Sequence, residues 1–357
     1  MMFKVFISAS SLEKLCIDEM SLPSKEQSSW FILLTKQNVI YLDKDICQDW
    51  SCEDPLFMFS QSYEISLKEA PVDYNVDLEA NPQNALNHPH DAFLLDIDQA
   101  KADAIQNQYG VVCQSTKNLS NCVVSEKGCH FSLNKGESTH SWSELFADKD
   151  RVPANALIIV DRYIFGFEGK LKSSYRDGVN NIEQILSSAL PDNVNCDFHV
   201  LVIFDARSST DLNFDIDAVA KELEDYKVNV LKKPYPVDIE LFSVSSKNLQ
   251  YGETHNRRIL SSYYIVTADH LLKVFRRDGS SITTQNLNLD YSFSEGLRDR
   301  SDMPQKRIDY LVDKLKALFS SACADIINGE AHSCEYVYYI NGQQDTLAHL
   351  KNRLILI

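Results

Sequence analysis

Apolar residues in the first part of the chain gather in short runs that polar segments separate. Short apolar runs have the length of strands, whereas apolar positions three or four residues apart indicate a helix. The predicted strands cover residues 3–7, 39–42, 93–97 and 111–113, helices begin at Ser10 and Asp98, and residues 30–34 fit a buried strand or a short helix. Gly110 follows the second helix, as expected at a helix C-terminus. This order is typical of an α/β layer around a parallel sheet.

Two further segments of this first part lack such a pattern. Residues 70–91 hold three prolines among many Asn and Asp residues, so they predict a loop. Residues 115–150 carry scattered polar residues and predict an irregular connection or a small hairpin. Because Pro153 precedes a strongly apolar run, we expect one domain at residues 1–150 and another at residues 151–357.

The apolar runs after Pro153 are longer and alternate with amphipathic segments. Strands are predicted at residues 156–165, 199–204 and 238–244, and helices at 179–190 and 214–226. This alternation predicts parallel strands joined by right-handed crossovers. The pattern then predicts a strand within 254–266 and its hairpin partner at 271–275. An amphipathic helix is predicted at 307–327. Residues 336–340 and 353–357 are predicted to be closing strands, or a strand and a short helix. The expected fold class is α/β with two domains, the second a mixed sheet flanked by helices.

Charge changes the picture of possible partners. The chain has 35 Lys and Arg against 51 Asp and Glu, which gives a formal net charge of −16, so its whole surface cannot attract nucleic acid or anionic lipid. Every arginine lies at or after Arg151. Since Arg is suited to bidentate recognition of phosphate and carboxylate groups, any anion site is expected in the second part, while the first part presents an acidic surface.

Composition also indicates a cellular setting. No run of apolar residues has the length that a membrane helix needs, and the N-terminal apolar run ends at Ile7, too early for a signal sequence. The nine cysteines, without such a signal, fit reduced thiols. We therefore expect a cytoplasmic protein without a membrane span.

Charged side chains stand at several predicted strand ends in the second part. The members of this set, each on a different strand or strand end, are Asp161, Asp205, Glu240 and the pair His255 and Arg257. Because strand ends meet at one edge of a sheet, these side chains are expected to converge in one cleft. Asp161, Asp205 and Glu240 also have the ligand chemistry of a magnesium site, which leaves a metal-dependent nuclease open.

The segments VDRYIF, VLVIFD, IELF and HNRRILSSYYIV together resemble, in their order, the phospholipase-D-like domain found at the C-terminus of MIT-domain proteins and in related bacterial proteins. The resemblance covers about residues 155–295, where His255 and Arg257 form a His-x-Arg sequence that opens a strand. In that superfamily one His attacks phosphorus, a second His protonates the leaving group, and a Lys neutralises the phosphate oxygens. The resemblance thus implies a phosphate site at His255.

The chain departs from the catalytic pattern of that superfamily. Arg257 stands where the signature has Lys, no acid stands at Ser262, and His270 and Lys273 have the wrong spacing for a second half-site. With one His, attack on phosphorus requires that two chains pair their sites, so the resemblance implies binding rather than turnover. The implied anion-binding residues are His255, Arg257, Arg258, Arg162 and Lys273, and Asp161 would orient an Arg or the imidazole.

Three functions are therefore carried forward. The first is a binding or adaptor component that recognises a phosphate-bearing ligand or a nucleic-acid backbone. It would need no cofactor and would act in an assembly with a protein partner or a second copy, and the resemblance suggests bacterial nucleic-acid defence as its setting. The second is a phosphodiesterase or nuclease that uses His255 or the acids Asp161, Asp205 and Glu240. The third is a structural interaction subunit whose acidic first part meets a basic partner.

Overall fold

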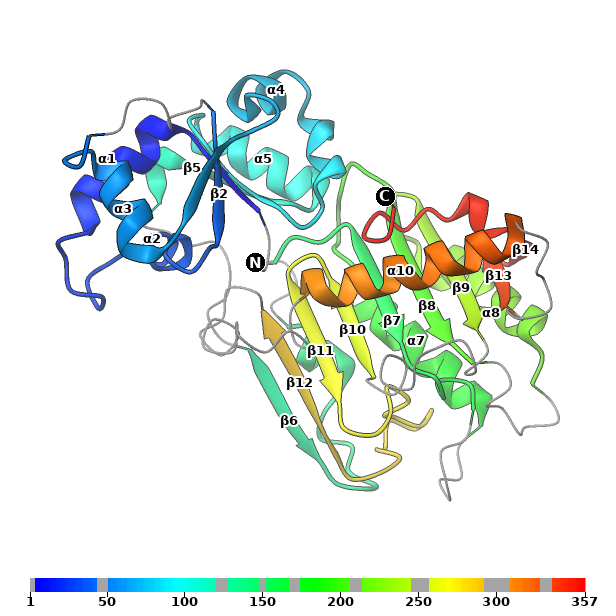
Figure 1. Ribbon diagram of the computed structural model, residues 1–357. Coiled ribbons are helices and arrows are strands. Elements are labelled where there is room, and N and C mark those ends of the chain that lie inside the picture. Colours follow the sequence, from blue (N-terminus) through cyan, green and yellow to red (C-terminus); the bar gives the residue numbers. More distant parts are fainter. Residues whose placement is uncertain are drawn as a thin grey trace.

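The computed structural model describes residues 4–43, 51–119, 128–147, 152–166, 174–205, 214–244, 257–291, 308–327 and 336–356. These residues form an α/β structure with one parallel sheet and one mixed sheet, each flanked by helices (Figure 1). Among the described helices, none is long and apolar enough to cross a membrane.

The smaller sheet has five parallel strands in the order β3-β2-β1-β4-β5. Helices α1, α2 and α3 pack on one face of it, and α4 and α5 pack on the other. The bounds are β1 Val5–Ile7, α1 Ala9–Glu19, α2 Ser29–Leu34, β2 Val39–Leu42, α3 Pro55–Tyr63, β3 Ser66–Glu69, α4 Tyr74–Ala80, β4 Ala92–Leu95, α5 Gln99–Tyr109 and β5 Val112–Ser115. Because helices cover both faces of this parallel sheet, its inner strands β1 and β4 are fully buried and read as continuous apolar runs.

The larger sheet has nine strands in the order β14-β13-β9-β8-β7-β10-β11-β12-β6. Its central strands β7, β8 and β9 are parallel, and the pairs on either side of them are antiparallel. The strand bounds are β6 Cys129–Leu133, β7 Ala156–Val160, β8 Phe198–Phe204, β9 Val237–Val244, β10 Arg258–Ser261, β11 Tyr264–Ala268, β12 Gln285–Tyr291, β13 Tyr336–Ile340 and β14 Gln343–Asp345.

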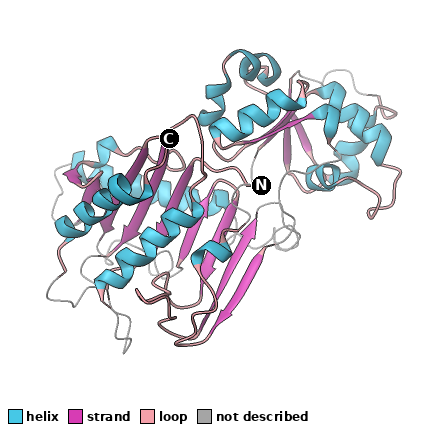
Figure 2. Cartoon of the chain, turned by 180° about the vertical axis from the view of Figure 1, so that it is seen from behind, coloured by secondary structure: helices cyan, strands magenta, loops and turns pink. Residues whose placement is uncertain are grey.

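Helices cover both faces of the larger sheet. Helices α7 (Tyr175–Ala189) and α8 (Ile216–Tyr226) lie on one face, with the short α6 (Trp142–Leu145) beside α7. Helix α10 (Ile308–Ile327) crosses the other face (Figure 1), and the view from behind places α7 and α8 in front of the strands (Figure 2). In the central strands β7, β8 and β9, each residue therefore points either to the face of α7 and α8 or to the face of α10, according to its position in the alternation.

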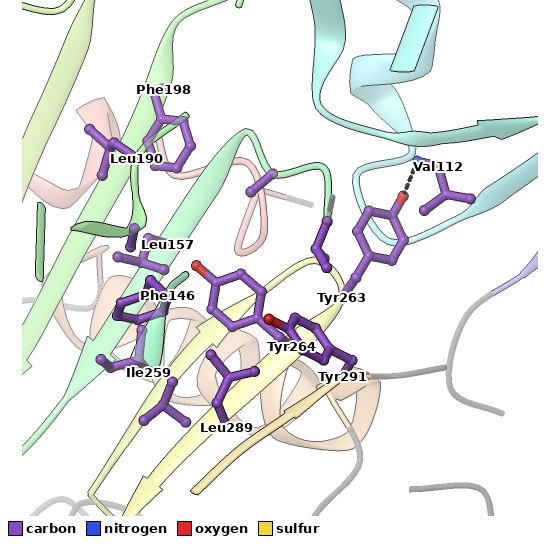
Figure 3. Packing of buried hydrophobic residues seen from close by; sticks show 14 of the residues in the cluster. Val112, Phe146, Leu157, Leu190, Phe198, Ile259, Tyr263, Tyr264, Leu289 and Tyr291 are labelled. Carbon is purple, nitrogen blue, oxygen red and sulfur yellow. Dashed lines mark hydrogen bonds between the residues drawn. The ribbon is translucent and has the colours of Figure 1, made fainter. Parts of the chain in front are cut away.

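The two sheets share one continuous apolar core. It contains residues from the smaller sheet, such as Val112, together with Leu157 and Ile259 from the larger one. Figure 3 shows part of this cluster, with Tyr263 reaching from the β10–β11 turn to the backbone of Val112. Strand β6 precedes residue 151 in sequence but pairs with β12, so the larger sheet takes a strand from the segment that the sequence assigns to the first part.

The structure decides one open alternative and overturns one local expectation. Residues 30–34, which fitted a buried strand or a short helix, are helical within α2, because the Ser28 hydroxyl accepts the Phe31 N–H as a helix cap. The expected loop at 70–91 contains α4, capped by Asp73, and a 3₁₀-helix at Pro82–Asn87. Asp, Asn and Pro begin helices as readily as they form loops.

The expected hairpin partner at 271–275 is not a strand. The turn lies earlier, at Ser262 and Tyr263, so that β10 pairs with β11. Side chains accept four backbone N–H groups of this segment: Gln285 accepts that of Leu271, Asp161 that of Leu272, and Asn181 those of Val274 and Phe275. This segment is apolar because it is buried, not because it belongs to the sheet.

Two further strand ends differ from the prediction. The run 156–165 leaves the sheet after Val160, because the Asp161 carboxylate accepts the Tyr163 N–H and holds a turn. Residues 353–355 form a turn rather than a strand, and the Asn352 amide nitrogen donates to the carbonyls of Leu157 and His199.

Candidate functional site

The candidate site lies where β7 and β8 end and β10 begins. Asp161 directly follows β7, and Asp205 directly follows the parallel strand β8. Strand β10 runs antiparallel to β7, and Arg258 pairs with Val160, so the start of β10 lies at the same edge. Carboxyl ends of parallel strands are where α/β folds place ligands.

Asp161 is a fully buried hydrogen-bond acceptor at this edge. Its Oδ1 accepts the Tyr163 N–H at 2.9 Å, and its Oδ2 accepts the Leu272 N–H at 2.8 Å. Burial raises the pKa of this carboxyl, while the two N–H donors and the charges of Arg257 and Lys273 act in the opposite direction. Asp161 therefore joins the turn after β7 to residue 272 and faces two cationic side chains.

Two arginines flank the ring of Tyr163. The guanidinium carbon of Arg162 lies 5.1 Å from the ring centroid, and that of Arg257 lies 6.0 Å from it. Arg162 Nε lies 3.6 Å from Asp205 Oδ2. Cation–π contact and the carboxylate together hold both guanidinium groups near the end of β7.

Lys273 and Arg258 occupy different positions around this edge. Lys273 is fully buried, and its ammonium donates to the carbonyl of Gly166. Arg258 is also buried, but it lies opposite Val160, whose side chain belongs to the cluster under α10. Asp161 points to the other face with Leu157 and Ile159, so the sheet separates Arg258 from the Asp161 group.

Glu240 does not join the other acids. It lies within β9, two strands from β7, where it accepts hydrogen bonds from the Tyr338 hydroxyl at 2.5 Å and the Lys351 N–H at 2.8 Å. Its neighbour two residues on, Phe242, packs under α10, so Glu240 faces α10 whereas Asp161 faces α7. Within the described residues, the three acids form no cluster that could share one metal ion. The expectation of one cleft is wrong for Glu240, while His255 lies outside the described residues.

A different cluster has the right ligand types for a cation. Asp197, His199 and Asp238 place one ligand atom each within 4.8 Å of one another, near the amino ends of β8 and β9. Burial and the Arg353 charge lower the pKa of His199 to about 4, so the imidazole is neutral at pH 7. Lys351 Nζ, however, lies 3.0 Å from Asp238 Oδ2 and already supplies a positive charge there. The sequence analysis did not consider these residues, because it looked for site residues at the carboxyl ends of strands, whereas these three precede a strand or lie at its amino end.

The smaller sheet has its own strand-order reversal between β1 and β4, the usual ligand position of such sheets. The hollow at this edge has a volume of about 10 Å³, which is the space of one water molecule. The first turn of α1 already donates to protein acceptors there, Ser11 N–H to Ser8 Oγ and Ala9 N–H to Asp43 Oδ1. The hollow therefore has room for about one water molecule, and these two N–H groups already have acceptors.

Tyr163 is the site residue that the sequence analysis missed. It directly follows Asp161 and Arg162 in the segment VDRYIF, and this position could have indicated that it belongs to the site.

Neither a protein-family model nor a curated protein matches the chain.

Proposed function

We propose that the larger sheet binds a phosphate-bearing ligand, such as a nucleic-acid backbone, at the edge formed by the ends of β7 and β8 and the start of β10. The observation that carries this proposal is the gathering of three cationic groups, Arg162, Arg257 and Lys273, at that edge. Two carboxyl groups, Asp161 and Asp205, accompany them, so these five side chains hold one more cationic than acidic group, in a strongly acidic chain.

The proposed roles follow from accessibility. Arg162 is partly exposed, so its guanidinium is the group that contacts the phosphate oxygens, in the bidentate geometry that Arg favours. Arg257 and Lys273 are buried and add positive potential from beneath. Asp161 and the Tyr163 ring are positioning residues, because they hold the turn and the arginines in place.

The architecture that goes with this function is also a proposal. We propose two domains, one around each sheet, with the larger one phospholipase-D-like. The two described sheets share no strand, which supports the division into two domains. Strand β10 begins at Arg258, three residues after His255, which supports the phospholipase-D-like assignment. The free thiols of Cys16, Cys52, Cys113, Cys129 and Cys196 fit the proposed cytoplasmic setting, in which a protein partner or second copy would complete a defence assembly.

Binding of fluorescein-labelled single- and double-stranded DNA and RNA, followed by anisotropy at low and moderate salt, tests the proposal. We expect Arg162→Gln to weaken binding by about tenfold and to reduce the slope of log K against log salt by about one, as for the loss of one phosphate contact. The matched control is Arg277→Gln, which removes the same charge at an exposed position after Phe275.

Unchanged binding in Arg162→Gln, with an unchanged melting temperature, would contradict the assignment of the site. Absence of binding by the wild type at low salt would exclude nucleic acid as the ligand. Cleavage of the probes that His255→Ala abolishes would instead make the protein an enzyme, and comparison of EDTA with Mg²⁺ would show whether a metal takes part.

A further inference from the structure

A buried histidine at the amino end of β8 makes no side-chain hydrogen bond with the described residues. His199 is 7% exposed, and its Nδ1 has no partner among them. Its Nε2 is directed at Asp238, but the 3.7 Å separation from Oδ2 exceeds hydrogen-bond length. Because burial lowers the pKa of His199 to about 4, the imidazole is neutral at pH 7 and forms no ion pair. A buried imidazole of this kind is uncommon and points to a missing neighbour.

The sheet brings three metal-ligating groups to one place. His199 on β8 lies directly beside Asp238 on the parallel strand β9. Asp197 precedes His199 by two residues, so it stands on the same face. One ligand atom from each of the three lies within 4.8 Å of the other two. An imidazole with two carboxylates is a donor set that suits zinc and related divalent transition metals.

The distances in this cluster also fit a metal ion. A tetrahedral zinc ion with ligands at about 2.1 Å sets its ligand atoms roughly 3.4 Å apart. The 3.7 Å between His199 Nε2 and Asp238 Oδ2 is close to that value. Asp197 is exposed, so rotation of its side chain can bring the carboxylate nearer. The Asn341 amide donates to Asp238 Oδ1 at 2.6 Å, as outer hydrogen bonds do when they orient a metal-binding carboxylate.

Two cationic side chains lie near the cluster, but neither is a hydrogen-bond donor to the His199 ring. Lys351 Nζ lies 3.0 Å from Asp238 Oδ2. The Arg353 guanidinium donates to the Asn155 carbonyl at 3.4 Å. Only an ion at the centre of the cluster would contact the imidazole and both carboxylates together.

The Lys351 ammonium is a replaceable partner of Asp238. It belongs to the C-terminal segment, which passes the starts of β8 and β9 (Figure 1). The Lys351 side chain is 48% exposed, so it can turn into solvent. The segment would keep its place, because the Lys351 N–H donates to Glu240 and the Asn352 amide donates to the His199 carbonyl.

We infer that Asp197, His199 and Asp238 form a site for a divalent transition metal such as zinc, and that the Lys351 ammonium competes with the metal for it. Three protein ligands leave one tetrahedral position for water. The metal would join the starts of β8 and β9, and Lys351 would turn into solvent. The proposed phosphate site lies at the opposite ends of the strands, so neither site depends on the other.

Titration calorimetry of the full chain with Zn²⁺, after removal of bound metal with a chelator, tests this inference. Asp197→Asn removes a ligand at an exposed position, so we expect it to weaken Zn²⁺ binding by about tenfold or more without changing the melting temperature. The matched control is Asp225→Asn, which removes an exposed carboxylate from α8 and should leave Zn²⁺ binding unchanged.

A second pair of variants tests the competition. Lys351→Ala should tighten Zn²⁺ binding by about tenfold, because a positive charge beside the ion is lost. Lys221→Ala removes the same charge at an exposed position of α8 and should change nothing.

Three results would overturn the inference. Absence of Zn²⁺ binding by both the wild type and Lys351→Ala at millimolar concentration would exclude the site. Binding that Asp197→Asn leaves intact would place the metal elsewhere. Unchanged or weaker binding in Lys351→Ala would show that the ammonium does not compete with the metal.

Discussion

Glu240 and His199 are buried titratable side chains beneath the C-terminal segment, and their pKa values shift in opposite directions. Burial raises the pKa of Glu240 from 4.5 to about 7, although hydrogen bonds from Lys351 N–H and Tyr338 act against it. Burial lowers the pKa of His199 from 6.5 to about 4, and the charge of Arg353 acts in the same direction. Burial therefore favours the neutral form of both groups.

Each shift makes stability depend on pH, with opposite sign. Between about pH 4.5 and 7 the folded protein binds more protons at Glu240 than the unfolded chain does, so this contribution to stability is lost as pH rises. Between about pH 4 and 6.5 the folded protein binds fewer protons at His199, so that contribution is lost as pH falls. The two effects oppose each other where the windows overlap.

We expect single variants to separate the two effects. The difference in the free energy of unfolding between Glu240→Gln and wild type should increase with pH between about pH 4.5 and 7. The same difference for His199→Gln should decrease with pH between about pH 4 and 6.5. The difference should reach roughly 1 to 3 kcal/mol across each window, because a tenfold change in a dissociation constant corresponds to roughly 1.4 kcal/mol.

Urea denaturation at closely spaced pH values measures these profiles. His90 and Asp161 also have shifted pKa values but are retained in both variants, so their contributions cancel in the comparison with wild type. Profiles that run parallel to wild type would contradict the burial of these two charges.

At the scale of elements, Asn181 on α7 joins three segments that are far apart in sequence. Its Oδ1 accepts N–H groups from Trp142 on α6 and from Val274 and Phe275. Its Nδ2 donates to the Asp177 carbonyl within α7 and to the Phe275 carbonyl. One amide thus satisfies the buried backbone of a segment that has no neighbouring strand.

Replacement of this amide should therefore be costly. We expect Asn181→Ala to lower the free energy of unfolding by about 3 kcal/mol or more, because several buried donors lose their acceptor together. The matched control is Asn180→Ala on the same helix, since the Asn180 Nδ2 makes no hydrogen bond with a described residue. Similar losses in the two variants, measured by urea denaturation, would contradict the joining role of Asn181.

The same elements show which predictions a sequence supports. Helix α5 with Gly110 at its end, and strands β8 and β9, were predicted because each pattern is local to the segment. The segment 271–275 was misassigned, because an apolar run is equally compatible with a strand and with a buried loop whose N–H groups meet side chains such as Asn181. The sequence placed Asp161, Asp205 and Glu240 in one cleft. The two aspartates do follow neighbouring strands at one edge, whereas Glu240 faces α10, because the face of a side chain within a strand depends on register.

At the scale of the whole molecule, the two sheets are joined by buried polar contacts as well as by the core. The Tyr263 hydroxyl donates to the Asp91 carbonyl before β4 and accepts the Val112 N–H at the start of β5. Gly110, with a φ of +62°, lies so close to the Ala154 carbonyl that a Cβ atom would be 2.2 Å from that oxygen. These contacts couple the smaller sheet to the segment that leads into β7.

We therefore expect the two sheets to unfold in one cooperative transition. Native-state hydrogen exchange should give the same opening free energy for the most protected amides of β4 and β8. Tyr263→Phe should lower both free energies by the same amount, about 1 to 3 kcal/mol, because it removes one buried hydroxyl that both donates and accepts a hydrogen bond. A decrease confined to β4 would show that the sheets open independently.

The sequence by itself determined where most strands and helices lie, that all arginines fall in the later part, and that a charged group follows β7. Periodicity, helix ends and composition are local properties, so they can be recognised without knowledge of neighbours. Only the tertiary structure decided that β6 joins the larger sheet, that Glu240 faces away from Asp161, and that the starts of β8 and β9 bring metal-ligating side chains together. Strand pairing and side-chain facing depend on register between distant segments, where a displacement of one residue reverses the face of every side chain.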